Sequence, residues 1–226
     1  CEDEPIIQKN LQQFRLKFGE NLSFSLHPQI RSREACIRST DKALRLASKY
    51  GTRLHVLHLS TADEIALFNK GMLAEKRITG EVCVHHLWFN DSFYPTMGAK
   101  IKWNPAIKCE NDRLALIRGL LDGKLDVVAT DHAPHTLAEK NQSYFQSPSG
   151  GPLLQHSLVA MLELAKQGYF TIEQVVEKMC HNPAIAFQIN NRGFIREGYF
   201  ADLAVVDLEA PFTVTPQNIA YQCGWS

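Results

Sequence analysis

The chain has 226 residues, and its 24 Lys+Arg balance its 24 Asp+Glu, so the formal net charge is zero. This length can bury a sizeable core, and a hydrophobic share of 45% is ordinary for a globular protein. The balanced charge offers no basic surface to a polyanion, so we predict no nucleic-acid partner. No apolar run reaches the ~18 residues that a bilayer span needs, so we predict no membrane partner.

The six cysteines are scattered along the chain and form no C-x-x-C pair. In a chain of this size they are interpreted as free thiols in a reducing, cytoplasmic setting. The first residues read CEDEP without an initiator Met, and the last four read CGWS. We therefore expect both ends to be cuts inside a longer chain.

Helices and strands are expected to alternate through the first two thirds of the chain. Apolar and small residues recur at helical spacing between Cys36 and Ala47, which predicts a helix there. A buried strand is expected over 53–59, followed by a helix from a Thr61–Glu64 capping box to Gly71. A second strand is expected over 78–84.

A third strand is expected over 125–130, after a helix that ends near Gly123. Two more helices should follow, one over 154–165 and one that opens with a Thr171–Gln174 capping box. Strands that alternate with helices predict an α/β fold with a parallel sheet and helical crossovers.

The residue pattern of the sequence changes after Phe187. A turn-rich stretch precedes a run over 201–208 that is typical of a strand, and no helix is expected after it. We therefore predict two domains, an α/β domain over 1–190 and the beginning of a small β-sandwich domain over 191–226.

Histidines and a carboxylate follow the expected strands. His58 closes the first strand, His85 and His86 follow the second, and Asp131 follows the third. Side chains at strand carboxyl ends converge in a (β/α)8 barrel, and zinc takes imidazole nitrogen and carboxylate oxygen. The residues alone also allow a structural histidine at 58 and a helix N-cap at 131. Strand alternation should send His55 to the opposite face, so we interpret it as structural.

Several segments, taken in order, resemble the dihydroorotases of the amidohydrolase superfamily. The most specific is ATDHAPH at 129–135, which is similar to the strand-eight signature of these enzymes. The others are CED at 1–3, RSREA at 31–35, HVLHLST at 55–61, EVCVHHL at 81–87, KWNP at 102–105 and GYFADL at 198–203. The resemblance covers nearly the whole chain and implies the later strands of a (β/α)8 TIM barrel.

The resemblance also implies a two-zinc active site. His58 matches a ligand of the more buried zinc, and Asp131 matches the carboxylate that binds the other zinc and acts as general base and acid. Four further positions match residues that hold the substrate through a side chain or the loop backbone. They are Asn104, His135, Ser149 and Gly150.

The implied reaction is the reversible cyclisation of N-carbamoyl-L-aspartate to dihydroorotate in pyrimidine biosynthesis. The family's strand-one His-x-His, its strand-four bridging ligand and the His before Cys1 lie outside this sequence. A catalytic zinc needs about three protein ligands. We therefore predict that this chain alone holds no normal zinc pair and is inactive.

Two alternatives remain open. The first is a hydantoinase or allantoinase, against which His135 argues, because a histidine there suits a substrate that carries a carboxylate. The second is a non-catalytic scaffold that binds aspartate transcarbamoylase, against which the intact His58 and Asp131 argue. Besides the small-molecule substrate, the candidate partners are a second copy of the chain and aspartate transcarbamoylase.

Overall fold

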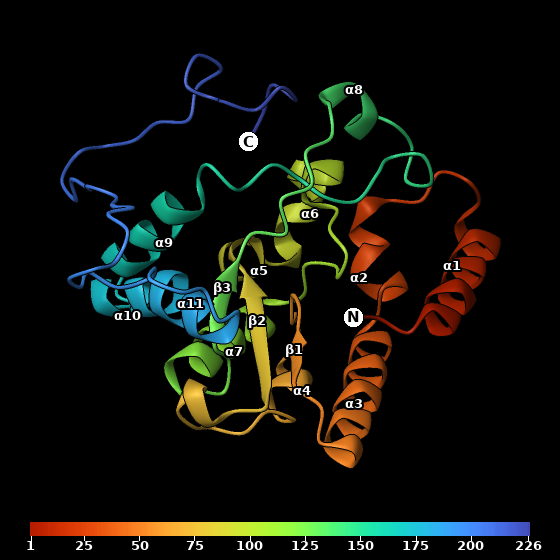
Figure 1. Cartoon of the computed structure of the whole chain (residues 1–226). Coiled ribbons are helices and arrows are strands. Elements are labelled where there is room, and N and C mark those ends of the chain that lie inside the picture. The colour runs from red at the N-terminus through yellow and green to blue at the C-terminus, as the bar shows by residue number, and fades with distance from the viewer.

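Three parallel strands form the central sheet of the computed structural model, which describes residues 1–226 (Figure 1). The strands β1 (Leu54–Val56), β2 (Ile78–Cys83) and β3 (Val127–Ala129) lie in sequence order. In the parallel register, Leu54 lies opposite Ile78 and Cys83 opposite Ala129. The parallel sheet and all three strand positions are confirmed, although β1 and β3 are shorter than expected.

Three helices near the N-terminus lie on one side of the sheet, to the right in Figure 1. They are α1 (Glu4–Phe18), α2 (His27–Ile30) and α3 (Arg33–Tyr50). The predicted helix around Cys36 is part of α3, which begins where the Ser32 hydroxyl accepts the Ala35 N–H. It ends at Gly51, whose φ of 62° is the left-handed conformation common after helices.

Short helices connect the strands. They are α4 (Ala62–Ile65), α5 (Val84–Trp88), α6 (Tyr94–Met97) and α7 (Glu110–Leu121). Three 3-10 turns lie among them, at Leu73–Glu75, Asp91–Phe93 and Gly98–Ile101, and a fourth, Phe24–Leu26, precedes α2. The helix predicted to reach Gly71 is only α4. Its capping box is half formed: Thr61 Oγ1 accepts the Glu64 N–H, but the Glu64 carboxylate turns to the Ser60 N–H and to hydroxyls.

The later helices lie on the other side of the sheet from α1–α3 or above it (Figure 1). They are α8 (Leu137–Lys140), α9 (Ser157–Lys166), α10 (Ile172–Val176), a π-helical turn over Glu177–His181 and α11 (Asn182–Ala186). The capping box predicted at Thr171 is confirmed, because both reciprocal hydrogen bonds with Gln174 are present. No helix is long and apolar enough to cross a membrane.

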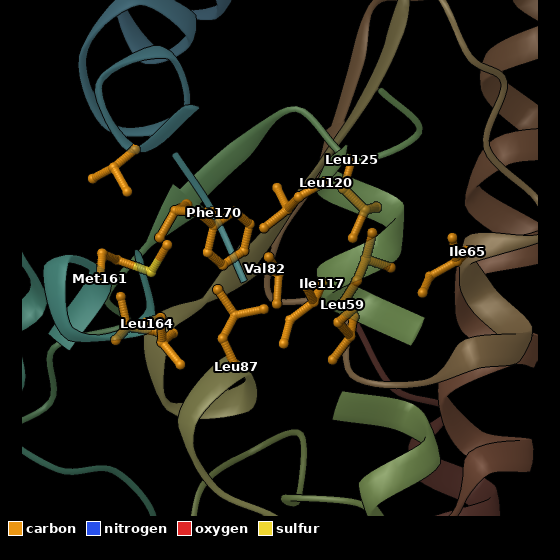
Figure 2. Packing of buried hydrophobic residues seen from close by; sticks show 14 of the residues in the cluster. Leu59, Ile65, Val82, Leu87, Ile117, Leu120, Leu125, Met161, Leu164 and Phe170 are labelled. Atoms are coloured by element: carbon orange, nitrogen blue, oxygen red, sulfur yellow. The ribbon is translucent and has the colours of Figure 1, made fainter. Parts of the chain in front are cut away.

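The main core consists of 16 buried residues between the sheet and the helices α7 and α9. Figure 2 shows Val82 of β2 facing side chains that include Leu87, Ile117 and Leu120. On α9, Met161 and Leu164 close the far side of the cluster (Figure 2). This packing holds the strands in place and therefore positions the residues directly after their carboxyl ends.

The strand expected over 201–208 is not formed. The chain after Phe187 has no helix or strand, and Val205 is 99% exposed. A strand is stable only when its backbone groups pair with a neighbour, and no segment of this chain pairs with 201–208. The division into 1–190 and 191–226 stays a prediction.

Truncating a core leucine tests this packing. Leu120 is fully buried on α7, so we expect Leu120→Ala to lower the free energy of unfolding by about 2–5 kcal/mol. The adjacent Leu121, 44% exposed, is the matched control, and Leu121→Ala should cost much less. Denaturant titration of the two variants checks this, and equal losses would contradict the described core.

Candidate active site

The carboxyl ends of the three parallel strands meet at one edge of the sheet. His58 follows β1 by two residues, and Asp131 follows β3 by two residues. Both have positive φ, 41° for His58 and 47° for Asp131, which is uncommon outside glycine. Such strained backbone is held by its surroundings and concentrates at functional sites.

Glu81, in the middle strand β2, connects this edge to β1. Its Oε1 accepts the backbone N–H of His58 at 3.2 Å, and its Oε2 lies 3.1 Å from His55 Nε2. His55 Nδ1 lies 2.8 Å from the Thr79 hydroxyl. Strand alternation does not extend to His58, because β1 ends at Val56 and the chain then turns through left-handed His58. The interpretation of His55 as structural stays a prediction, and its ring is held by Thr79 and Glu81.

The electrostatic surroundings of His58 and Asp131 share the Glu81 carboxylate. Burial lowers the pKa of His58, and the charge of Glu81 opposes this shift. Asp131 remains exposed, yet partial desolvation raises its pKa and the Glu81 carboxylate raises it further. Glu81 acts electrostatically on both residues, which follow strands at the same carboxyl edge of the sheet. An imidazole and a carboxylate at one sheet edge are suited to binding a metal or moving a proton.

The four residues expected to hold substrate lie in three segments that hydrogen bonds join together. His135 Nε2 is 3.2 Å from the Ser149 carbonyl oxygen, so these two are brought together. The Gly150 N–H donates to the carbonyl of Lys102 at 2.8 Å, two residues before Asn104. Asn104 Oδ1 is buried without a hydrogen-bond partner. Since buried amide oxygens are normally paired, this atom is available to a bound molecule.

A glycine is required at position 150 because the chain there passes very close to Ala133. The φ of Gly150 is 118°, and a Cβ at this position would lie 2.6 Å from Ala133 Cβ and 3.0 Å from the Ala133 carbonyl. The next residue, Gly151, pairs with His132 in an isolated parallel bridge. The segment after β3 is therefore held tightly against 149–151.

Two buried lysines, which the sequence analysis did not assign a role, organise the same loop. Lys140 Nζ donates to the carbonyls of Pro148 and Gly150, both at 2.8 Å. Lys102 Nζ donates to the carbonyls of Tyr144 at 2.7 Å and Ser147 at 2.6 Å. Burial lowers the pKa of each lysine to about 8, and the repulsion of Lys102 contributes to the shift of Lys140.

A surface hollow of about 900 Å³ lies away from these residues. It is formed by the last turns of α3 and by 67–78, at the end of the sheet where β2 begins. None of the six predicted site residues contributes to it. The size of a hollow does not by itself indicate a reaction, so the residues that follow the strands remain the candidate site.

Comparison with known proteins decides the family. The amidohydrolase family profile matches residues 35–223. The chain belongs to the amidohydrolase family. A dihydroorotase from Halalkalibacterium halodurans is 39% identical over 176 residues, 77% of this chain and 41% of that protein. A dihydroorotase from Methanosphaera stadtmanae is 30% identical over 221 residues, 96% of this chain and 50% of that protein.

Among solved structures, the L-hydantoinase (dihydropyrimidinase) from Arthrobacter aurescens shares the fold with a TM-score of 0.88 at 24% identity. The similarity covers 96% of this chain and 49% of the hydantoinase. The chain therefore spans about half the length of the relatives it matches. Its parallel strands and crossover helices are consistent with part of a barrel.

The buried lysines predict a pH dependence of stability. The pKa of Lys140 in the folded chain is about 8, below the ~10.4 of an unfolded chain, so the folded chain loses this proton first as pH rises. The stability contributed by Lys140 should therefore increase between about pH 8 and 10. We expect the difference in unfolding free energy between the wild type and Lys140→Met to grow in favour of the wild type over this range.

Denaturant titrations at several pH values measure that difference. Lys42→Met, at an exposed position of α3, is the matched control and should show no such trend. A difference for Lys140→Met that stays flat or falls as pH rises would contradict the burial of the ammonium group.

Proposed function

We propose that this chain supplies the C-terminal part of the active site of a zinc-dependent dihydroorotase. The complete enzyme would interconvert N-carbamoyl-L-aspartate and dihydroorotate in pyrimidine biosynthesis. The observation that supports this most is that His58 and Asp131 both follow strands at the carboxyl edge of the parallel sheet, with the His135–Ser149 contact four residues after Asp131. Relatives named dihydroorotase match this chain at 30–39% identity.

The donor chemistry at this edge fits zinc, since amidohydrolases are typically metal-dependent and zinc takes imidazole and carboxylate ligands. His58 would hold one ion and Asp131 the other, with the remaining ligands supplied from outside this chain. When bound, the two ions would acidify a water molecule and polarise the ring carbonyl.

Asp131 is proposed to move the proton. Its raised pKa brings a carboxylate closer to the range in which it accepts a proton and releases it within one turnover. In ring opening, an Asp131 oxygen takes the proton of the attacking water and delivers it to the ring nitrogen as the amide bond breaks. Ring closure uses the same carboxylate in the reverse order.

His135, Asn104 and the loop backbone are proposed to orient the ring. Asn104 Oδ1 is buried and unpaired, and we propose that it accepts a substrate N–H. His135 is proposed to interact with the substrate carboxylate. Lys140, which donates to the carbonyls of Pro148 and Gly150, is proposed to keep the Ser149–Gly150 backbone rigid before substrate arrives, which would reduce the entropic cost of orientation.

The architecture of the complete protein is part of the proposal. We infer that β1, β2 and β3 are later strands of a (β/α)8 barrel, and that 191–226 begins a small β domain whose pairing strands lie outside this chain. Exposed strand edges of the incomplete barrel need partners, which the missing strands would provide. A second copy of the protein and aspartate transcarbamoylase are the proposed macromolecular partners.

A hydantoinase is the second candidate, favoured by the structural similarity to the Arthrobacter aurescens enzyme. Hydantoin and allantoin rings lack the carboxylate of dihydroorotate. We therefore expect the complete protein, assayed with zinc on the three rings, to hydrolyse dihydroorotate with the highest kcat/KM. A preference for hydantoin or allantoin would reject the dihydroorotase assignment and leave the cyclic amidohydrolase chemistry in place.

The Asp131→Asn variant of the complete protein tests the proton-transfer role. It removes a metal ligand and the proton carrier together, so we expect turnover to fall by ~10²-fold or more. Asp122→Asn is the matched control, because Asp122 is an exposed carboxylate paired only with Lys70. Retention of more than about a tenth of the wild-type rate in Asp131→Asn would reject the role.

A further inference from the structure

A second group of metal-binding side chains lies where β2 passes into α5. Cys83 ends β2, and His85 and His86 lie in the first turn of α5. The three residues are 0%, 1% and 2% exposed, and one ligand atom from each lies within 4.8 Å of the others. None of them has a role in the proposed catalytic chemistry.

The imidazoles of this group are buried but incompletely hydrogen-bonded. Neither ring nitrogen of His85 nor the Nδ1 of His86 makes a hydrogen bond of ordinary geometry, although the Thr130 backbone lies close to the His85 ring. Buried polar groups are normally satisfied, so several unsatisfied nitrogens around one point require an explanation. A cation bound between them would supply the missing partner.

The tautomer of His86 follows from its one hydrogen bond. His86 Nε2 lies 3.1 Å from the Pro105 carbonyl oxygen, which can only accept, so Nε2 carries the hydrogen. Burial lowers the pKa of His86 to about 3, so the ring is neutral and Nδ1 keeps its lone pair. A ring nitrogen that donates to a backbone carbonyl while the other is free is the arrangement found in metal-ligating histidines.

The orientation of His85 is also fixed. Its ring stacks on Trp103, with ring centroids 4.4 Å apart and ring planes 6° apart. The centroid of the His85 ring also lies 4.2 Å from the centroid of the His86 ring. Stacking on the indole restrains the rotation that would let the imidazole seek another partner. Both histidines are therefore held in place before any ligand arrives.

We propose that Cys83, His85 and His86 bind a single soft divalent cation such as zinc, separate from the ions assigned to His58 and Asp131. One thiolate and two imidazoles are a usual donor set for zinc, with a fourth position left to water. Zinc bonds of about 2.0–2.3 Å are short enough that binding draws the three donors together.

Binding exchanges a proton for the metal. Burial raises the pKa of the Cys83 thiol, so the sulfur is protonated without a cation. As the metal–sulfur bond forms, the S–H bond breaks and the proton leaves to solvent. The Glu81 carboxylate, whose charge already acts on Cys83, would offset the positive charge of the bound ion.

Cobalt(II) titration of the full 226-residue chain tests the proposal without any activity measurement. Cobalt bound by a thiolate absorbs strongly in the near ultraviolet, whereas His58 and Asp131 contain no sulfur. We expect this charge-transfer band to saturate at a single equivalent of cobalt and to disappear in Cys83→Ser. Because the readout is independent of turnover, its outcome does not depend on the proposed enzyme function.

Two matched cysteine variants separate Cys83 from other thiols. Cys36→Ser removes a second buried thiol. Cys1→Ser removes the thiol of Cys1, a residue that contacts the His58 side chain. Both should keep the band, with circular dichroism confirming that each variant is folded. Absence of the band in the wild type, its survival in Cys83→Ser or its loss in Cys1→Ser would overturn the proposal.

Discussion

Parallel pairing of β1, β2 and β3 is the constraint on which the candidate site depends. It brings three carboxyl ends to one edge, so that His58 and Asp131, 73 positions apart in the sequence, both follow strands at that edge. Glu81 in the middle strand reinforces this by accepting the His58 N–H and by acting electrostatically on Asp131. A slip of one residue in the β1–β2 register would turn Glu81 away and release the left-handed backbone of His58.

The loop that follows β3 is stabilised by buried charge rather than by regular structure. Lys102 and Lys140 between them bind four backbone carbonyls in the stretch 144–150. Burying two ammonium groups is costly, but hydrogen bonds to carbonyl dipoles offset the cost and leave the loop with a single conformation. The close contact of Gly150 with Ala133 then seats the loop against the strand-end segment.

The sequence predicted the strands, α3 and the Thr171 cap because periodicity and capping are local properties. It also predicted which residues follow the strands. It assigned no role to Glu81, Lys102 or Lys140, since their partners lie between 8 and 45 residues away and a charged residue in an apolar segment carries no mark of its partner. The strand expected over 201–208 depended on pairing with another segment, which local propensity cannot supply.

Diffraction from crystals of the complete protein grown with zinc, measured at the zinc absorption edge, would test the placement of the catalytic residues most directly. We expect one anomalous peak about 2.0–2.2 Å from a His58 ring nitrogen and one at the same distance from an Asp131 carboxylate oxygen. The two peaks should lie close to one another at the strand carboxyl ends. Zinc absent from both residues, or His58 and Asp131 facing opposite sides of the sheet, would contradict it.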